Sequence, residues 1–483
     1  MKRVDASKIA GITLAFLVAT TIASSAQTLT TLVSFDETNG GVLSWDLVQG
    51  VDGNFYGSGG FGGANNLGTV FQITPEGTLA TLDRLEYSHL SVQAMDGNLY
   101  GTTPYSGTGT GGTVFKLTPG GTLTTLYNFC SQPACADGQS PFGGVIQGND
   151  GNFYGATADG GAYGYGTVFK ITPAGELTTL YSFPSYAFAN TALVEGNDGN
   201  FYGTTESGGA NGYGTIFRVT TTGRLTILHS FSGPDGKSPH TALTLGSDGN
   251  FYGTTSTGGA NDPTLCEGVG CGTIFKITLR GLLTTLYSFC AKSGCTDGQW
   301  PTGDLVEGSD GNFYGTNQAG GAFGYTCVLG SCGTVFKITP QGTLTTLHSF
   351  SGSDGSMPYA GLVQGTDGVF YGSTIMGSDL SCGGGYGCGT VFNLSVGLGP
   401  FVETRPTNGS AGTAVTILGN HLLGSTSVIF NHTVATFEVV SDTEITATVP
   451  TGATTGPVAV TTADGTLKSK VPFRVGWWLN HPF

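Results

Sequence analysis

Four loops of this chain share the motif Asp-Gly-x-x-Pro, and each places a different side chain after its proline. The residues at that position are Phe142, His240, Thr302 and Tyr359, and Trp45 and Trp300 lie in corresponding loops. Aromatic rings and an imidazole on a symmetric frame are typical of a binding mouth, for which a glycan is one ligand class. Loop drift explains the same variation equally well. The candidate ligand-binding residues are Trp45, Phe142, His240, Trp300 and Tyr359.

Catalysis would need an acid and a base, or a nucleophile with its base, on neighbouring loops. Carboxylates that accompany His240 on these loops are Asp159, Glu206, Asp262, Glu267 and Asp379. Nothing in their spacing pairs one with another, and solvated loop charges are the ordinary interpretation. The sequence has no Gly-x-Ser-x-Gly elbow, phosphate-binding loop or His-Glu-x-x-His helix. We therefore assign no catalytic residue, no metal site and no cofactor.

The elements that would position these loops repeat along the chain. The hexapeptide Asp-Gly-Asn-Phe-Tyr-Gly, or a close variant, begins at Asp52, Asp96, Asp150, Asp198, Asp248, Asp310 and Asp367. Each copy is followed by a relative of Gly-Thr-Val-Phe-Lys-Ile-Thr, and six of these by a relative of Thr-Leu-Thr-Thr-Leu-Tyr-Ser-Phe. β-Branched and aromatic residues between glycine turns predict four short strands in each unit.

The missing seventh copy of the last element stands at the other end of the chain. Residues Thr28–Phe35 read Thr-Leu-Thr-Thr-Leu-Val-Ser-Phe, whereas the seventh unit ends at Ser395 without that element. A closed ring needs such an exchange because its first and last segments share one sheet, and a linear solenoid has no use for it. The pattern predicts an all-β protein, a seven-bladed β-propeller over 27–397 closed by the N-terminal strand.

The connections divide into two kinds. The turn after each Gly-Thr-Val-Phe strand never changes length, whereas the second-to-third connections and the links between units vary. In an antiparallel blade the two kinds emerge on opposite faces, so one face is constant and the other is variable. Function usually lies on variable loops held by a rigid frame. We expect any ligand on the variable face.

Three features recur in the units and allow more than one interpretation. The Asp of Asp-Gly-Asn suits a tight turn, with calcium as the alternative, and no EF-hand-like loop is present. The Phe-Tyr pairs, such as Phe55 with Tyr56 and Phe313 with Tyr314, suit an inter-blade core, with sugar platforms as the alternative. A polar position three residues before the Asp favours hydrogen bonding between blades over a polar channel ring. Its residues are Gln49, Gln93, Gln147, Glu195, Glu307 and Gln364, with Leu245 as the exception.

Ten cysteines fall into five close pairs, all in variable-face loops. The pairs are Cys130 with Cys135, Cys266 with Cys271, Cys290 with Cys295, Cys327 with Cys332, and Cys382 with Cys388. In an exported chain, neighbouring partners in even number predict local disulfides, each worth roughly 2 kcal/mol. Zinc is the alternative, but no histidine accompanies the pairs at finger-like spacing.

The start of the chain predicts export. Residues 1–26 are predicted to be a secretory signal, with an uncleaved anchor as the alternative. They contain basic residues, a mostly apolar run from Ile9 to Ala23, and a small-residue cleavage site after Ala26. No later segment approaches the length of a transmembrane helix. Acidic residues outnumber basic ones 32 to 17, which argues against nucleic acid as a partner. We expect a secreted or cell-surface protein whose partner is an extracellular glycan or a protein surface.

After Gly399 the glycine hexapeptides stop and a new pattern of short alternating strands begins. It includes Gly412–Gly419, Val428–Phe430, Ser441–Pro450 and Gly456–Thr461. Residues 400–476 closely resemble an IPT/TIG domain, which implies an immunoglobulin-like β-sandwich common as a spacer, and 477–483 form a short tail. Residues 28–395 resemble the GloVer tandem-repeat family of exported bacterial proteins. That resemblance implies export and repeat architecture, and brings no catalytic residues.

Together these observations favour a non-catalytic extracellular binding or surface-interaction protein. The ligand would lie on the disulfide-bearing face, with the C-terminal module as a spacer. A secreted propeller hydrolase or lyase acting on polysaccharide, and a structural surface-layer component, are the alternatives.

Overall fold

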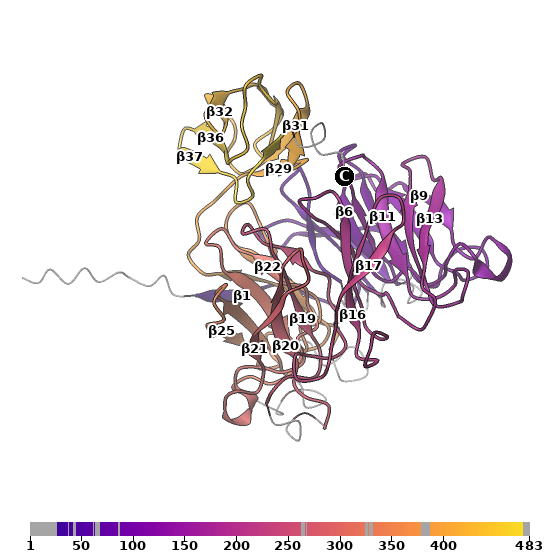
Figure 1. The fold of residues 1–483 in the computed structure, drawn as a ribbon. Helices are drawn as coiled ribbons and strands as arrows, with labels where there is room; N and C mark the ends of the chain where they lie inside the picture. Colours follow the sequence, from indigo (N-terminus) through magenta and orange to yellow (C-terminus); the bar gives the residue numbers. More distant parts are fainter. Residues whose placement is uncertain are drawn as a thin grey trace, which may run out of the picture.

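A computed structural model shows an all-β molecule made of a repeat domain and a separate C-terminal unit, drawn in orange and yellow in Figure 1. The structure describes residues 27–476 except 37, 42–44, 61, 63–67, 86, 262–265, 267, 324–326, 328–331 and 378–386. The predicted signal segment 1–26, the tail 477–483 and Cys382 lie outside the described residues, as do Asp262, Glu267 and Asp379. In the part described, no helix has the length and apolar character to cross a membrane.

The repeat domain contains seven four-stranded antiparallel sheets, which we number along the sequence. Sheet 1 has β2 (Val48–Gln49), β3 (Phe55–Gly59), β4 (Thr69–Ile73) and β5 (Leu79–Asp83). Sheet 2 has β6 (His89–Gln93), β7 (Leu99–Thr103), β8 (Thr113–Leu117) and β9 (Leu123–Asn128). Sheet 3 has β10 (Val145–Gln147), β11 (Phe153–Thr157), β12 (Thr167–Ile171) and β13 (Leu177–Ser182). Sheet 4 has β14 (Val194–Glu195), β15 (Phe201–Thr205), β16 (Thr215–Val219) and β17 (Leu225–Ser230).

The remaining three sheets follow the same order. Sheet 5 has β18 (Thr244–Leu245), β19 (Phe251–Thr255), β20 (Thr273–Ile277) and β21 (Leu283–Ser288). Sheet 6 has β22 (Val306–Glu307), β23 (Phe313–Asn317), β24 (Thr334–Ile338) and β25 (Leu344–Ser349). Sheet 7 has β26 (Val363–Gln364), β27 (Phe370–Thr374), β28 (Thr390–Ser395) and, from the N-terminus, β1 (Thr28–Ser34). Two short 3-10 turns, η2 (Pro133–Cys135) and η4 (Ser293–Cys295), lie in loops between sheets.

The strand β1 is the outer strand of sheet 7. It pairs antiparallel with β28, from Thr28 opposite Ser395 to Ser34 opposite Thr390. The amide of Phe35 continues the ladder by donating to the carbonyl of Gly389 at 3.1 Å. The N-terminal segment therefore supplies the fourth strand that the last repeat lacks.

Successive sheets pack through the Phe-Tyr pairs of their second strands. At six junctions the tyrosine of one sheet packs on the phenylalanine of the next, as Tyr154 does on Phe201 with ring centroids 3.8 Å apart. In sheet 2, Leu99 takes the place of the phenylalanine. The same contact joins the last sheet to the first, where Tyr371 stacks on Phe55 at 3.9 Å. All these rings are buried, so the Phe-Tyr pairs form the core between sheets as predicted.

The glycine after each Phe-Tyr pair is required by close packing. A Cβ on Gly155 would lie 2.6 Å from the ring of Phe169 on the third strand and 2.8 Å from the carbonyl of Gly144 on the first. Such contacts leave no room for a side chain, so the three inner strands pack tightly only with glycine here.

The Asp-Gly-Asn motif forms the turn between first and second strands. In sheet 3, Asp150 Oδ1 accepts the amide of Asn152 at 3.0 Å, and Tyr154 Oη donates to Asp150 Oδ2 at 2.8 Å. Gly151 adopts a φ of 80°, where a side chain would be strained. The tyrosine–aspartate bond recurs in all seven sheets. The turn interpretation of this Asp is confirmed.

The polar position before the turn joins neighbouring sheets. Gln93 Oε1 of sheet 2 accepts the amide of Val51 in sheet 1 at 2.8 Å, and the equivalent bond recurs at five other junctions. One of these joins Thr366 of sheet 7 to Gln49 of sheet 1 at 3.1 Å. The predicted hydrogen bonding between repeats is confirmed, and Leu245 alone cannot take part.

The C-terminal unit is a β-sandwich. Its first sheet contains β29 (Glu403–Arg405), β31 (Ala414–Leu418), β35 (Glu444–Thr448) and β34 (Thr436–Val439). Its second contains β33 (Thr433–Val434), β32 (Ser427–Phe430), β36 (Val458–Thr462) and β37 (Gly465–Lys468). Strands β30 (Asn408–Gly409) and β38 (Arg474–Val475) form a parallel pair. A core of buried aliphatic residues, with Phe430 packed edge-on against Phe473, fills the space between the sheets.

This unit packs against the face of the repeat domain that carries the Asp-Gly-Asn turns. Thr443 Oγ1 donates to the carbonyl of Val51 at 2.7 Å, and the amide of Phe401 donates to the carbonyl of Thr366 at 2.9 Å. Arg405 Nη2 reaches the carbonyl of Gln49 at 3.0 Å. The module expected to be a spacer is thus docked on the constant face, because these polar groups are paired across the interface.

Phe35, which follows β1, tests how much the N-terminal strand contributes to stability. Its side chain is fully buried and contacts the ring of Phe71, with centroids 5.5 Å apart. Phe35→Ala should therefore lower the free energy of unfolding by about 3–5 kcal/mol, measured by urea denaturation. The control Leu282→Ala removes a side chain that is 70% exposed and should cost less than about 0.5 kcal/mol. Equal effects of the two substitutions would contradict this role of β1.

Candidate functional site

The first strands of the sheets surround a common central space. A cavity of about 690 Å³ is lined from six of them, at positions one residue before the polar position that joins the sheets. Those residues are Val48, Val92, Ile146, Val194, Thr244 and Val363. Because side chains alternate along a strand, residues two and four positions earlier face the same space, closer to the variable loops. The residues two positions earlier form an inner level, and those four positions earlier form an outer level. The candidate site is built from these two levels.

The inner level consists of seven equivalent residues, one from each sheet. Each directly precedes, in the sequence, the residue that packs on the glycine of the second strand. In four sheets it is small, and in sheets 1, 2 and 6 it is polar. The residues are Asp46, His89, Gly144, Ala192, Ala242, Asp304 and Gly361. The three polar members mark a departure from the repeat consensus.

Asp46 and Asp304 hold neighbouring first strands in the same way. Asp46 Oδ1 accepts the amide of Gly361 at 2.6 Å, and Asp304 Oδ1 accepts the amide of Ala242 at 2.7 Å. Burial, together with the charge of Asp304, raises the pKa of Asp46 to about 8. Burial also raises the pKa of Asp304, against the hydrogen bond from Ala242 and the attraction of His240. At neutral pH Asp46 is therefore largely a neutral acid, able to donate a hydrogen bond or a proton.

His240 is the centre of a polar cluster at the outer level. Its Nε2 lies 2.6 Å from Tyr359 Oη, and its Nδ1 lies 3.4 Å from Glu206 Oε2. Asn190 Nδ2 donates to the same Glu206 oxygen at 3.1 Å. The hydrogen bond from His240 lowers the pKa of Glu206, so this carboxyl is ionised at neutral pH. Burial, and then the charge of Glu206, raise the pKa of Tyr359, which keeps its hydroxyl protonated.

Aromatic side chains continue around the same mouth. Trp45 stacks on the imidazole of His89, with centroids 4.4 Å apart and planes at 9°. His89 Nδ1 lies 2.9 Å from the carbonyl of Phe142, and burial lowers the pKa of His89 to about 4, so the ring is neutral. The ring of Phe142 contacts Tyr105 at 5.5 Å and Phe188 at 6.2 Å. Tyr105 is 50% exposed, which gives this row of rings an accessible edge.

The structure brings four of the five predicted binding residues into two contacting groups. His240 and Tyr359 touch, and Trp45 and Phe142 are joined through His89. Trp300 is different, because it precedes its proline and the structure shows no contact of its ring with the other four. Its amide donates to the carbonyl of Cys271 at 2.9 Å, and its indole nitrogen is buried without a hydrogen-bond partner among the described residues.

Sequence reasoning missed Asp46, His89, Asn190 and Asp304. The sequence did distinguish Asp46 and Asp304, because the equivalent inner-level position is glycine or alanine in every other repeat except that of sheet 2. His89 was hidden by a bulge in β6, which shifts the register by one residue. Of the loop carboxylates named from the sequence, Glu206 joins the cluster.

The aspartate of the Asp-Gly-x-x-Pro motif is a structural anchor. Tyr127 Oη donates to Asp137 Oδ2 at 2.9 Å, and in two other sheets histidine takes the place of tyrosine. His229 lies 2.8 Å from Asp235, and His348 lies 2.8 Å from Asp354. The motif therefore fixes the loop that presents the variable residue after its proline.

The cysteines constrain the same loops through disulfides. Disulfides join Cys130 with Cys135, Cys266 with Cys271, Cys290 with Cys295, and Cys327 with Cys332, as predicted. Cys388 is also disulfide-bonded, and its predicted partner Cys382 lies outside the described residues.

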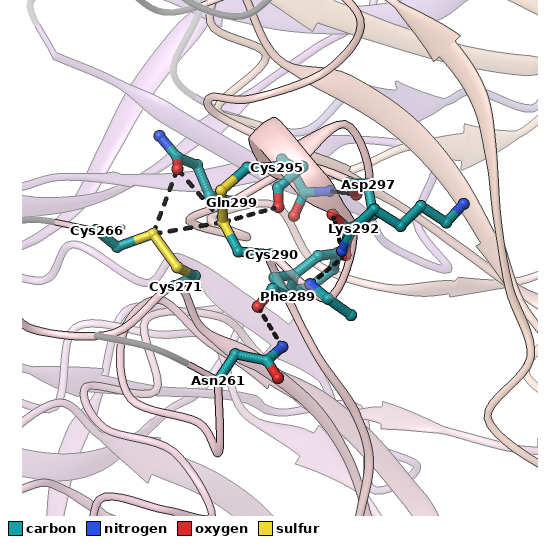
Figure 2. Close-up of a disulfide and its surroundings, with 12 residues drawn as sticks. Asn261, Cys266, Cys271, Phe289, Cys290, Lys292, Cys295, Asp297 and Gln299 are labelled. Carbon is teal, nitrogen blue, oxygen red and sulfur yellow. Dashed lines mark hydrogen bonds between the residues drawn. A yellow bond between two sulfur atoms is a disulfide. The ribbon is translucent and has the colours of Figure 1, made fainter. Parts of the chain in front are cut away.

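Two disulfides lie side by side between sheets 5 and 6. Figure 2 shows Cys266–Cys271 next to Cys290–Cys295, with the sulfurs of Cys266 and Cys290 3.5 Å apart and Gln299 Oε1 3.3 Å from Cys266 Sγ. All four cysteines are buried, and their sulfurs lie within 4.8 Å of one another. As thiolates they could share one metal ion, but each sulfur is committed to a disulfide, which disfavours the zinc alternative.

The acid pair makes stability depend on pH. The pKa of Asp46 is about 8 in the folded protein and near 4 in an unfolded chain. The folded state therefore holds the extra proton between these values, so Asp46 contributes most to stability below pH 4, and this contribution is lost as the pH rises from 4 through 8. Asp46→Asn should flatten the decline measured by urea denaturation at pH 5, 7 and 9. The exposed control Asp464→Asn should keep it, and an unchanged slope in Asp46→Asn would contradict the raised pKa.

Two family models together match most of the described chain from residue 83 onward. The model of the Gloeobacter/Verrucomicrobia repeat matches residues 83–264 and 184–392, and that of the IPT/TIG domain matches residues 402–475. No curated protein matches the chain.

Several solved structures resemble the fold at low identity. One is a predicted oxidoreductase (glucose dehydrogenase) from Thermus thermophilus, at 16% identity, covering 76% of this chain and 100% of that one, with a TM-score of 0.38. A protein of unknown function from Bacteroides thetaiotaomicron is 12% identical, covering 77% and 76%, at 0.41. A luciferin-regenerating enzyme is 10% identical, covering 78% and 97%, at 0.41. At these scores the likeness carries no argument about ligand or reaction.

Proposed function

This chain belongs to the Gloeobacter/Verrucomicrobia repeat family, and we propose that it is a secreted seven-bladed β-propeller that binds a glycan at the variable-face mouth of its channel. We call that mouth the loop-face site and define it by Trp45, Phe142, Glu206, His240 and Tyr359. The observation that carries the proposal is the contact of His240 with Tyr359, which come from loops 119 positions apart.

Contacts between the first and last sheets support a closed ring of seven blades. Sheet 7 contains the N-terminal strand, and its Tyr371 stacks on Phe55 of sheet 1 in the same way as between other neighbours. A ring has two faces, and the IPT/TIG domain packs on the constant one. The variable face is the one whose loops the disulfides and proline motifs fix, so it is the natural place for a ligand.

The chemistry of the loop-face site suits a sugar. Pyranose rings present apolar C–H faces, which pack on aromatic rings, and hydroxyls, which pair with carboxylates, amides and imidazoles. Trp45, Phe142 and Tyr105 supply the rings, and Glu206 and Asn190 supply polar groups held in place by their own hydrogen bonds. Fixed side chains lose little conformational entropy on binding, which favours affinity.

Secretion is supported by the same loops. Disulfides are characteristic of oxidising compartments, and four are present among the described residues. An extracellular setting is also where a polysaccharide ligand would be met.

Glycan binding can be tested with an array of bacterial and plant oligosaccharides, followed by calorimetry on the bound glycan. Tyr359→Phe removes one hydroxyl at the mouth and should weaken binding by roughly tenfold, the effect of one lost hydrogen bond. Trp45→Ala should weaken it further because a stacking surface is lost. Tyr165→Phe, on a variable loop with its ring 40% exposed, is the matched control and should bind as the parent does. If no glycan binds, or if Tyr359→Phe and Tyr165→Phe behave alike, the loop-face site is wrong.

The different protonation states of Asp46 and Glu206 favour a second candidate function, hydrolysis of a polysaccharide. Asp46 is largely protonated at neutral pH, which suits a general acid, and Glu206 is ionised, which suits a base. A glycosidase would need these two roles near one sugar bond.

Product analysis separates the two functions. If the chain is a hydrolase, incubation with the bound polysaccharide should release reducing ends. Asp46→Asn should then reduce the rate by at least 100-fold while glycan binding remains, because the amide keeps the bond to Gly361 but has no acid proton. Binding without released oligosaccharide would support the non-catalytic function.

A further inference from the structure

The hydrogen-bonded ring that joins the sheets is broken at one junction. In six junctions a glutamine or glutamate side chain accepts an amide of the preceding sheet, such as Gln147 from Met95 and Glu195 from Asn149. Between sheets 4 and 5 the acceptor position holds Leu245, whose side chain has no hydrogen-bonding atom. The amide that would have been accepted is that of Asn197.

Asn197 is left with unpaired polar atoms as a result. Among the described residues its amide N–H has no hydrogen-bond partner, and its side-chain Oδ1 is buried without one. Burying such groups unpaired costs about 1–3 kcal/mol each, so a break of this kind calls for a compensating ligand or solvent.

Asn197 lies on the wall of the cavity between the repeat domain and the IPT/TIG domain. This cavity has a volume of about 690 Å³ and shares Asn197 and Arg474 with a neighbouring cavity of about 480 Å³. Its repeat-domain wall contains the valine and isoleucine level of the first strands and Leu245, together with polar residues. The carboxylates on this wall, Glu195 and Asp198, already accept hydrogen bonds from Asn149 and from Asn200 and Tyr202. The opposite wall comes from the IPT/TIG residues around Arg405 and Arg474.

The two arginines on that wall differ in their partners. Arg405 is fully engaged, because Nη2 donates to the carbonyl of Gln49 and Nε donates to Glu403 at 3.1 Å. The structure shows no hydrogen bond or ion pair of the Arg474 guanidinium with a described residue, and Glu195 attracts it only at longer range. Arg474 is therefore a half-buried cation that lines the same two cavities as Asn197.

We propose that this cavity is a second binding site, for a small carboxylate with an apolar body. The carboxylate is held by the Asn197 amide and the Arg474 guanidinium, and the apolar body lies along Val194, Ile146 and Val92. A guanidinium and a backbone amide are both donors, which selects an acceptor-only group such as a carboxylate. The apolar wall adds affinity in proportion to the buried chain.

Octanoate is the probe, and octanol and acetate are its matched controls for charge and for chain. Calorimetry on the mature chain at pH 7 should show saturable one-to-one binding of octanoate. Octanol and acetate should each bind at least tenfold more weakly, because octanol lacks the carboxylate and acetate lacks the apolar chain. Equal binding of octanol would show a merely apolar cavity and overturn the carboxylate assignment, and absence of octanoate binding would overturn the site.

Two substitutions test the residues named. Leu245→Gln restores the acceptor of the other junctions, and Arg474→Gln removes the free cation, so each should weaken octanoate binding at least tenfold. The exposed Arg224→Gln is the control and should leave affinity unchanged. Octanoate binding that survives both Leu245→Gln and Arg474→Gln would refute the proposal.

Stability measurements show whether a loss of octanoate binding results from misfolding of the variant. Leu245→Gln should melt no lower than the parent, since it completes the hydrogen-bonded ring, and the Asn197 amide should exchange with solvent more slowly. If this variant fails to fold, Arg474→Gln alone decides. Neither substitution touches the loop-face site, so glycan binding should persist in both, which separates failure of this proposal from failure of the first.

Discussion

The pairing of β1 with β28 is the constraint on which the other contacts of the repeat domain depend. It places the N-terminus in the last sheet, and it accompanies the bond from Thr366 to Gln49, whose residues are 317 positions apart. With these contacts made, the first sheet meets the last through the same ring stack and hydrogen bond that join most other neighbouring sheets. These contacts hold the first strands of sheets 1 and 7 next to each other and so position the loops that follow from them.

The repeat pattern predicted much of this arrangement because the interactions that form it are local or repeat exactly. The turn at Asp150, the buried stack of Tyr154 and the disulfides each involve residues whose identity recurs or whose partner is near in sequence. Contacts across the ring do not have that property. Asp46 lies beside Gly361 only because sheets 1 and 7 meet, and no spacing in the sequence states this. Docking of the IPT/TIG domain through Thr443 was likewise not predictable from repeats.

Departures from the repeat are where the candidate chemistry lies. A sheet can replace alanine by aspartate at the inner level, or glutamine by leucine at the junction, without changing the frame, because six other copies hold it. Asp304 and Leu245 are such departures. Leu245 lies on a first strand that lines the central cavity, and Asp304 lies two residues before the first strand of sheet 6. The repeated contacts thus keep the frame rigid, and the residues that depart from the repeat make the two ends of the central space chemically different.

The two ends differ further because of charge. The chain carries an excess of acidic residues, yet the IPT/TIG surface directed at the channel presents Arg405, Lys470 and Arg474. Burial lowers the pKa of Lys470, while Glu403 and Glu307 oppose that shift, and its ammonium donates to the carbonyl of Glu307 at 3.3 Å. Cations buried in this way require a fixed partner surface, which a loosely tethered spacer does not provide. The C-terminal domain therefore places basic side chains over the end of the repeat domain that carries the Asp-Gly-Asn turns, where Glu195 and Glu307 attract them.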